Sequence, residues 1–243
     1  MKLLNMYIAL FSTLSISIAQ TYLSPADLDF SLEKKSIYIS ATTGKQLLVF
    51  DMATKKVTAS IPLPGEPTGS VFSNDGKTLF VAGGGHEGRI WNVENDTVTG
   101  ELITGHTPMS PILSPDGGTL YVCNRFDNDV SFIDLATGET AARVAVLREP
   151  TASDLTPDGT YLFVGNLIPE GRADLDYVAS KISVINTETR EVTSIPLVNG
   201  AEGVRGIKVS PDGKTVFATH LMARFLVPTT QLERGWISTD ALS

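Results

Sequence analysis

Cysteine is nearly absent from this chain, since Cys123 is the only one in 243 residues. One cysteine excludes an internal disulfide, and it excludes a covalent c-type haem site within the chain because that site needs Cys-x-x-Cys-His. Cys123 lies in the apolar stretch TLYVCN. We therefore expect a small buried side chain there and not a reactive thiol.

Positive charge is also scarce. The chain has 19 Lys and Arg against 27 Asp and Glu, a formal net charge of -8, and no basic cluster longer than Lys34-Lys35 or Lys55-Lys56. An acidic chain lacks the charge that neutralises phosphates or anionic lipid headgroups. We predict that it binds neither nucleic acid nor a membrane surface.

Short catalytic motifs are missing as well. There is no Gly-x-Ser-x-Gly elbow, and Gly83-Gly84-Gly85 does not open a helix after a strand, as a phosphate-binding loop does. Four aspartates belong to repeated turns, which explains them without a carboxylate pair: Asp75, Asp116, Asp158 and Asp212. We predict no catalytic residues and no metal-ligand set, and we lean against an enzyme for this chain alone.

A long apolar run occurs only at the N-terminus. Lys2 precedes a mostly apolar stretch from Leu3 to Ile18, and Ser17 and Ala19 have the spacing of a signal-peptidase site. We expect residues 1–19 to be a signal peptide, which predicts a periplasmic or secreted protein. The alternative is a single membrane anchor, for which the segment is short and rather polar.

Turn residues are plentiful and recur regularly. Repeats aligned on the first residue of a turn begin at Ser31, Ser73, Ser114, Thr156 and Ser210, with spacings of 42, 41, 42 and 54. A period near 40 with about four short strands per unit is typical of a β-propeller blade.

Each part of the repeat has a local physical reason. In the Pro-Asp-Gly turn, Pro presets φ, Asp bonds back to the backbone and Gly accepts a positive φ. An apolar strand follows, as a sheet buried between blades requires. We expect the third strand to end at a residue that caps the next hairpin, at Asp51, Asn92, Asp134 and Asn186.

The copy that begins at Leu113, LSPDGGTLYVCNRFDNDVSFIDLATGE, resembles the YVTN family of β-propeller repeats. Tyr121-Val122-Cys123-Asn124 lies on the tetrapeptide that names the family, and the resemblance covers roughly Phe30 to Thr219. It implies an all-β propeller over residues 20–243, with about four and a half four-stranded blades. The final DALS aligns with NDVS of Asn128 to Ser131, inside a third strand.

Four and a half blades do not close a ring of the usual size. We expect an incomplete ring, part of a seven- or eight-bladed propeller, from an N-terminal fragment or truncated reading of a longer protein. The alternative is a natural short form that closes by association with a second copy, because an open end leaves an apolar sheet face and edge unpaired.

Two enlarged loops are expected on one face of the propeller, at residues 167–181 and 221–241. Arg125 lies in the corresponding short loop of the third blade. Cations and aromatics on adjacent loops suit an anionic small molecule or a protein partner. The candidate binding residues are Arg125, Arg172, His220, Arg224, Arg234 and Trp236.

The three histidines are His86, His106 and His220. His220 occupies the position of Asn124 and Asn166 in other repeats, and His86 and His106 fall in loops of the same face. A three-histidine metal or haem site is therefore conceivable, although the second and fifth blades lie apart around a ring. Turn hydrogen bonds are the alternative role.

Three functions follow from these patterns. The first is an exported binding or scaffold module that uses its long-loop face. The second comes from a resemblance of THLMARFLVPTTQLERGW to a loop of larger exported propeller proteins with cytochrome c peroxidase-like domains, which implies a c-type haem downstream and no cofactor in this chain. The third is a propeller similar to the lactonase group, which would need an acid/His constellation at the central channel.

Overall fold

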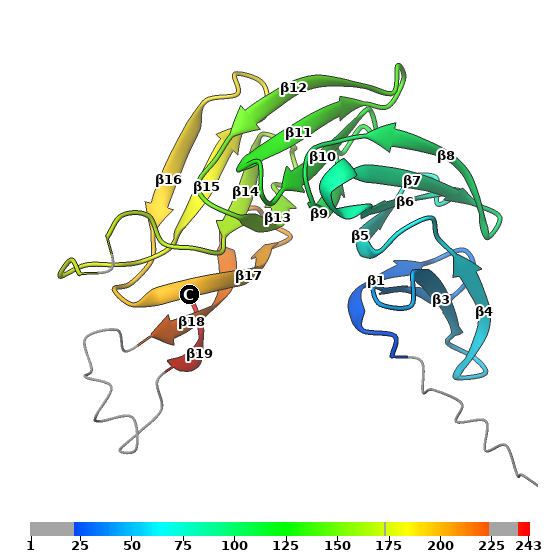
Figure 1. The fold of residues 1–243 in the computed structure, drawn as a ribbon. Helices are drawn as coiled ribbons and strands as arrows, with labels where there is room; N and C mark the ends of the chain where they lie inside the picture. Colours follow the sequence, from blue (N-terminus) through cyan, green and yellow to red (C-terminus); the bar gives the residue numbers. More distant parts are fainter. Residues whose placement is uncertain (1–21, 173, 224–237) are drawn as a thin grey trace, which may run out of the picture.

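The computed structural model describes residues 22–172, 174–223 and 238–243. These residues form five antiparallel sheets arranged around a common axis as the blades of a β-propeller (Figure 1). Within the described ranges the one helix is a 3₁₀ turn, η1 (Gly85–Glu87). The all-β propeller expected from the repeat spacing is confirmed.

The blades follow the chain in order, and their bounds are as follows. The strands are β1 (Pro25–Ser31), β2 (Ser36–Ala41), β3 (Gln46–Asp51) and β4 (Lys56–Pro62); β5 (Pro67–Phe72), β6 (Thr78–Gly83), β7 (Arg89–Glu94) and β8 (Thr97–Ile103); β9 (Pro108–Leu113), β10 (Thr119–Asn124), β11 (Asp129–Asp134) and β12 (Glu139–Ala145); β13 (Pro150–Leu155), β14 (Tyr161–Asn166), β15 (Lys181–Asn186) and β16 (Val192–Pro196); β17 (Ala201–Val209), β18 (Val216–Ala223) and β19 (Ser238–Leu242).

Every sheet is a meander in which each strand pairs with the next one along the chain. The first strands β1, β5, β9, β13 and β17 contact one another in sequence and line the axis, while the fourth strands lie at the outer edge (Figure 1). Four sheets have four strands and the fifth has three in the described residues. In the fifth, His220 pairs with Ala241 as Asn124 pairs with Asp129, which confirms the alignment of DALS with NDVS.

The hydrophobic core lies in layers between successive blades. Strand β10 shows why: Tyr121 and Cys123 pack in the layer shared with the fourth blade, whereas Leu120 and Val122 pack in the layer shared with the second. Alternate residues of one strand therefore face opposite neighbours. Cys123 is fully buried, and burial raises the pKa of its thiol to about 12, so it is the inert side chain expected from its surroundings.

The Pro-Asp-Gly turns form as expected. In the third blade, Asp116 accepts hydrogen bonds from the Ser114 hydroxyl and the Gly118 N–H, and Gly117 has φ of 76°. These bonds to the carboxylate lower the pKa of Asp116. Because the bonds join neighbours in sequence, the turn needs no other part of the fold.

One expected strand end is wrong. Strand β7 continues past Asn92 to Glu94, and its hairpin turns at Asn95 and Asp96, which both have positive φ. Two such residues suit the tight two-residue turn that matches the twist of the flanking strands. Asn92 therefore lies inside the strand and its buried Oδ1 has no partner, whereas Asp51, Asp134 and Asn186 do cap their hairpins.

Candidate functional site

The loops between second and third strands and the loops between blades share one face of the propeller. Main-chain hydrogen bonds join them in a chain: Thr107 N–H donates to Gly85 O at 2.7 Å, Arg125 N–H to Thr107 O at 3.1 Å, and Leu167 N–H to Glu149 O at 2.9 Å. We call this surface the loop face. Main-chain hydrogen bonds therefore help to hold its backbone in place.

A row of side chains crosses the loop face from the second blade to the fourth. The His86 and His106 rings lie 4.6 Å apart, and the His106 and Phe126 rings lie 5.1 Å apart, both edge to face. The Arg125 guanidinium stacks on Phe126 at 4.8 Å and is bound by Glu149, with Nη2 2.7 Å from the carboxylate. We call these five residues the rim row.

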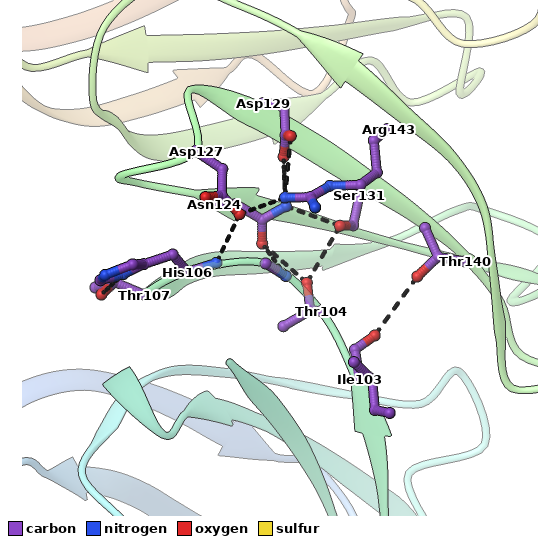
Figure 2. A network of polar contacts seen from close by, with 11 residues as sticks. Ile103, Thr104, His106, Thr107, Asn124, Asp127, Asp129, Ser131, Thr140 and Arg143 are labelled. Atoms are coloured by element: carbon purple, nitrogen blue, oxygen red, sulfur yellow. Dashed lines mark hydrogen bonds and ion pairs between the residues drawn. The ribbon is translucent and has the colours of Figure 1, made fainter. Parts of the chain in front are cut away.

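A polar network surrounds the loop that carries His106 of the rim row (Figure 2). Buried Asn124 accepts from Thr104 Oγ1 and Gly105 N–H and donates to Asp129 and Ser131. These bonds fix the loop that carries His106 to the third blade.

Arg143 and Asp127 complete this network (Figure 2). Arg143 is paired with Asp127 and with Asp129, and the His106 N–H donates to Asp127 at 2.8 Å. The bond from His106, and then Arg143, hold the pKa of Asp127 below its usual value. The network therefore fixes the backbone that carries the rim row.

The structure places three of the six predicted binding residues. Arg125 is in the rim row, and Arg172 is exposed in the long loop but paired with Asp174. His220 is 4% exposed, with its ring nitrogens 3.1 Å from Leu221 O and 2.8 Å from Ser243 Oγ. Arg224, Arg234 and Trp236 lie outside the described residues, as does the signal peptide predicted over 1–19.

The three histidines do not come together at one site. Only His86 and His106 are in contact among them. His220 replaces Asn124 in its blade and bonds Ser243 as Asn124 bonds Ser131, a packing role within the fifth sheet. His86 and His106 come together on the loop face. In the described part of the chain no group of three or more His, Cys, Asp or Glu is placed to hold a metal ion.

Sequence reasoning missed Phe126 and Glu149. Phe126 stands two residues after Asn124 in a loop, and it is 49% exposed. An aromatic residue in a short loop among turn formers was an available signal. Glu149 gave no signal, because its pairing with Arg125 depends on how the third and fourth blades pack.

A groove runs between the long loop of the fourth blade and the fifth blade, with a volume of about 290 Å³. Apolar side chains line most of it, with Arg148 and Glu202 at its polar edge. Its apolar lining consists of Ile168, Pro169, Val178, Ala201 and Ala223. The enlarged loop therefore forms one wall of a groove on the predicted face.

The inner strands line an open central cavity of about 560 Å³. Its side chains also join the blades: Asp27 accepts from Ser70 N–H, Asp29 from Phe72 N–H, and Asp154 from Val209 N–H. The carboxylates are thus used in holding neighbouring blades together. The acid/His constellation that a lactonase-like propeller needs is not present among the described residues that line this cavity.

Asp29 gives the central cavity a pH dependence. Burial raises the pKa of Asp29 from 3.8 to about 6, opposed by bonds from Phe30 and Phe72 N–H. The folded chain then binds this proton more tightly than the unfolded chain, so Asp29 stabilises the fold fully below about pH 4 and that contribution is lost as pH rises to about 6.

We expect Asp29→Asn to gain stability relative to the natural chain as pH rises from 4 to 7, measured by urea unfolding at each pH. Asp116→Asn is the control with a flat response, because the pKa of Asp116 is lowered in the fold and its contribution changes only below about pH 4. A stability difference for Asp29→Asn that is the same at every pH would contradict this assignment.

No helix in the described ranges is both long and apolar enough to cross a membrane. No family model matches the chain, so the resemblance to YVTN repeats is supported only as far as the propeller fold.

Known proteins resemble the chain in sequence and in structure. It is 25% identical over 191 residues to Antigen Lp49 of Leptospira interrogans, covering 73% of this chain and 41% of that protein. The hydrazine synthase of Kuenenia stuttgartiensis has a similar structure, with a TM-score of 0.80 and 21% identity over 94% of this chain and 64% of that one. The chain spans less than two thirds of either relative, and the structural likeness shows the fold alone.

Proposed function

We propose that this chain is an exported binding module that holds a protein partner on its loop face. The observation that carries the proposal is the rim row, in which His86, His106, Phe126 and Arg125 form one partly exposed strip across the second and third blades. Aromatic and Arg side chains dominate the binding energy of protein interfaces.

The rim row is prepared for binding before any partner arrives. Its backbone is joined by the bonds from Thr107 to Gly85 and from Arg125 to Thr107, and the Asn124 network surrounds the loop that carries His106. A surface that is already ordered loses little entropy when it binds. This supports recognition by the loops and not only a covering role for them.

Charge favours a protein over an anionic small molecule. Both described arginines among the predicted residues are neutralised, Arg125 by Glu149 and Arg172 by Asp174. An anion would have to compete with those carboxylates, whereas a protein surface can use the stacked guanidinium and the ring of Phe126 together.

An exported location is part of the proposal. It rests on the signal-like residues 1–19, and the name of the curated relative, an antigen, fits a protein that is met outside the cell. Enzymatic function is not part of it, because the described residues supply a surface and no assembled set of reacting groups.

Photo-crosslinking in the producing cells tests the proposal. A benzophenone amino acid replaces Phe126 in one variant and Lys77, an exposed residue in a turn on the opposite face, in another. We expect a discrete adduct from position 126, reduced at least about tenfold when Arg125→Ala is added, and none from position 77. Equal adducts from both positions would overturn the loop-face assignment.

A further inference from the structure

We propose that His86 and His106 form a two-imidazole site for a first-row transition-metal ion, with zinc as the ion to test. The observation is that the two rings lie close together, with 4.6 Å between their centroids and 70° between their planes. His86 comes from the loop between β6 and β7, and His106 from the connection between β8 and β9. The proposal does not depend on the binding partner, because both ligands belong to this chain.

The ring separation suits a shared ion. Zinc binds imidazole nitrogen at about 2.0–2.1 Å, and two imidazoles on one tetrahedral ion have centroids roughly 5 Å apart. The rings of His86 and His106 already lie close to that separation. To form the site, the two side chains, one exposed and one half-buried, rotate so that a nitrogen of each ring faces the ion.

His106 is oriented as metal-binding histidines usually are. Its Nδ1 lies 2.8 Å from Thr107 Oγ1. When Nδ1 carries the proton it donates to that oxygen, and Nε2 keeps its lone pair for the ion. A hydrogen bond from the second ring nitrogen fixes the tautomer and the ring plane in most histidine-metal sites.

The fold holds the two loops at this distance. Gly88 and Gly105 pack so closely that a Cβ on Gly88 would collide with the Gly105 carbonyl, and Thr107 N–H donates to Gly85 O at 2.7 Å. The backbones that carry His86 and His106 are therefore fixed, and forming the site requires no loop to order.

The nearby carboxylates are already paired with other groups, so the two imidazoles are the only protein ligands proposed for the ion. Glu87 is next to His86 but interacts with Arg89, at 3.6 Å, and Asp127 is occupied by Arg143 and by the His106 N–H. No third His, Cys, Asp or Glu completes a set in the described residues. Water fills the remaining positions, so the ion exchanges readily and its binding is weaker than at a closed four-ligand site.

Titration calorimetry with zinc chloride at pH 7.5 tests the proposal on the full chain, purified without a polyhistidine tag. We expect one ion per chain, and loss of that binding in His86→Ala and in His106→Ala. Thr107→Val, which keeps the shape but removes the hydroxyl, should weaken binding about tenfold, and Thr107→Ser should bind as the natural chain does.

The controls separate this site from other outcomes. Arg125→Ala alters the rim row at a side chain that stacks on Phe126 and not on either histidine, so zinc binding should persist while crosslinking from position 126 is reduced. His220 is buried with both ring nitrogens engaged, so it offers no competing site. No zinc binding by the natural chain, or undiminished binding by the His86→Ala and His106→Ala variants, would overturn the proposal and leave the partner hypothesis untouched.

Discussion

Gly105→Ala is expected to destabilise the chain by about 3 kcal/mol, because the added methyl group has no free space on the loop face. A Cβ at Gly105 would overlap Arg143, Asn124 and Asp127 at once. These groups can withdraw only by breaking bonds of the network that holds the second blade to the third. Urea unfolding measures the loss.

Gly100→Ala is the matched control. Gly100 lies five residues earlier in β8, and the nearest atom to a Cβ there is Asn92 Nδ2 at 3.7 Å. An alanine fits that space and restricts the unfolded chain, so the variant should be neutral or more stable by about 0.4–1 kcal/mol. If the two variants unfold at the same urea concentration, the crowding at Gly105 is not what the structure indicates.

The Gly105 variant also probes the binding surface. Displacing the Asn124 network moves the loop of His106, so zinc binding and partner crosslinking should both weaken in the folded Gly105→Ala protein. In Gly100→Ala both should remain, since that strand is away from the rim row.

Asp154→Ala is expected to cost about 2–3 kcal/mol, because it leaves a buried donor without a partner. The Asp154 side chain is 8% exposed, and its carboxylate accepts from Val209 N–H of the fifth blade at 2.7 Å. Val209 is itself buried, so water cannot readily replace the lost acceptor. Chemical unfolding followed by intrinsic fluorescence measures the change.

Two further variants separate the hydrogen bond from the charge. Lys208 pairs with Asp154 at 3.0 Å but its side chain is 77% exposed, so Lys208→Ala should cost less than about 1 kcal/mol. Asp154→Asn keeps an acceptor and should lose less stability than Asp154→Ala. A cost of Lys208→Ala as large as that of Asp154→Ala would show that the ion pair, and not the bond to the backbone, joins these blades.

The blade junctions show how the repeat becomes a propeller. Asp27, Asp29 and Asp154 each carry a hydrogen bond from an inner strand to the backbone of the next blade, and Ser153 and Ser110 bond in the same way. Apolar layers supply the driving force between blades, while these bonds fix the alignment of one sheet on the next.

The sequence by itself determined the fold class, the number of repeats and the turns. Pro-Asp-Gly turns and two-residue periodicity act between neighbours in the chain, so Asp116, Gly117 and the alternation in β10 could be predicted without any partner blade. The extent of β7 could not, because the choice between Asn92 and Glu94 as its end depended on the turn at Asn95 and Asp96.

Only the tertiary structure decided the site. The contact of His86 with His106 requires Gly88 and Gly105 to pack together, and the neutralisation of Arg125 requires Glu149 from the connection to the next blade. The burial of His220 depends on Ser243 in a paired strand. Contacts between residues 17 to 24 positions apart are set by how loops and sheets pack, and the repeat pattern, which is local, carries no record of them.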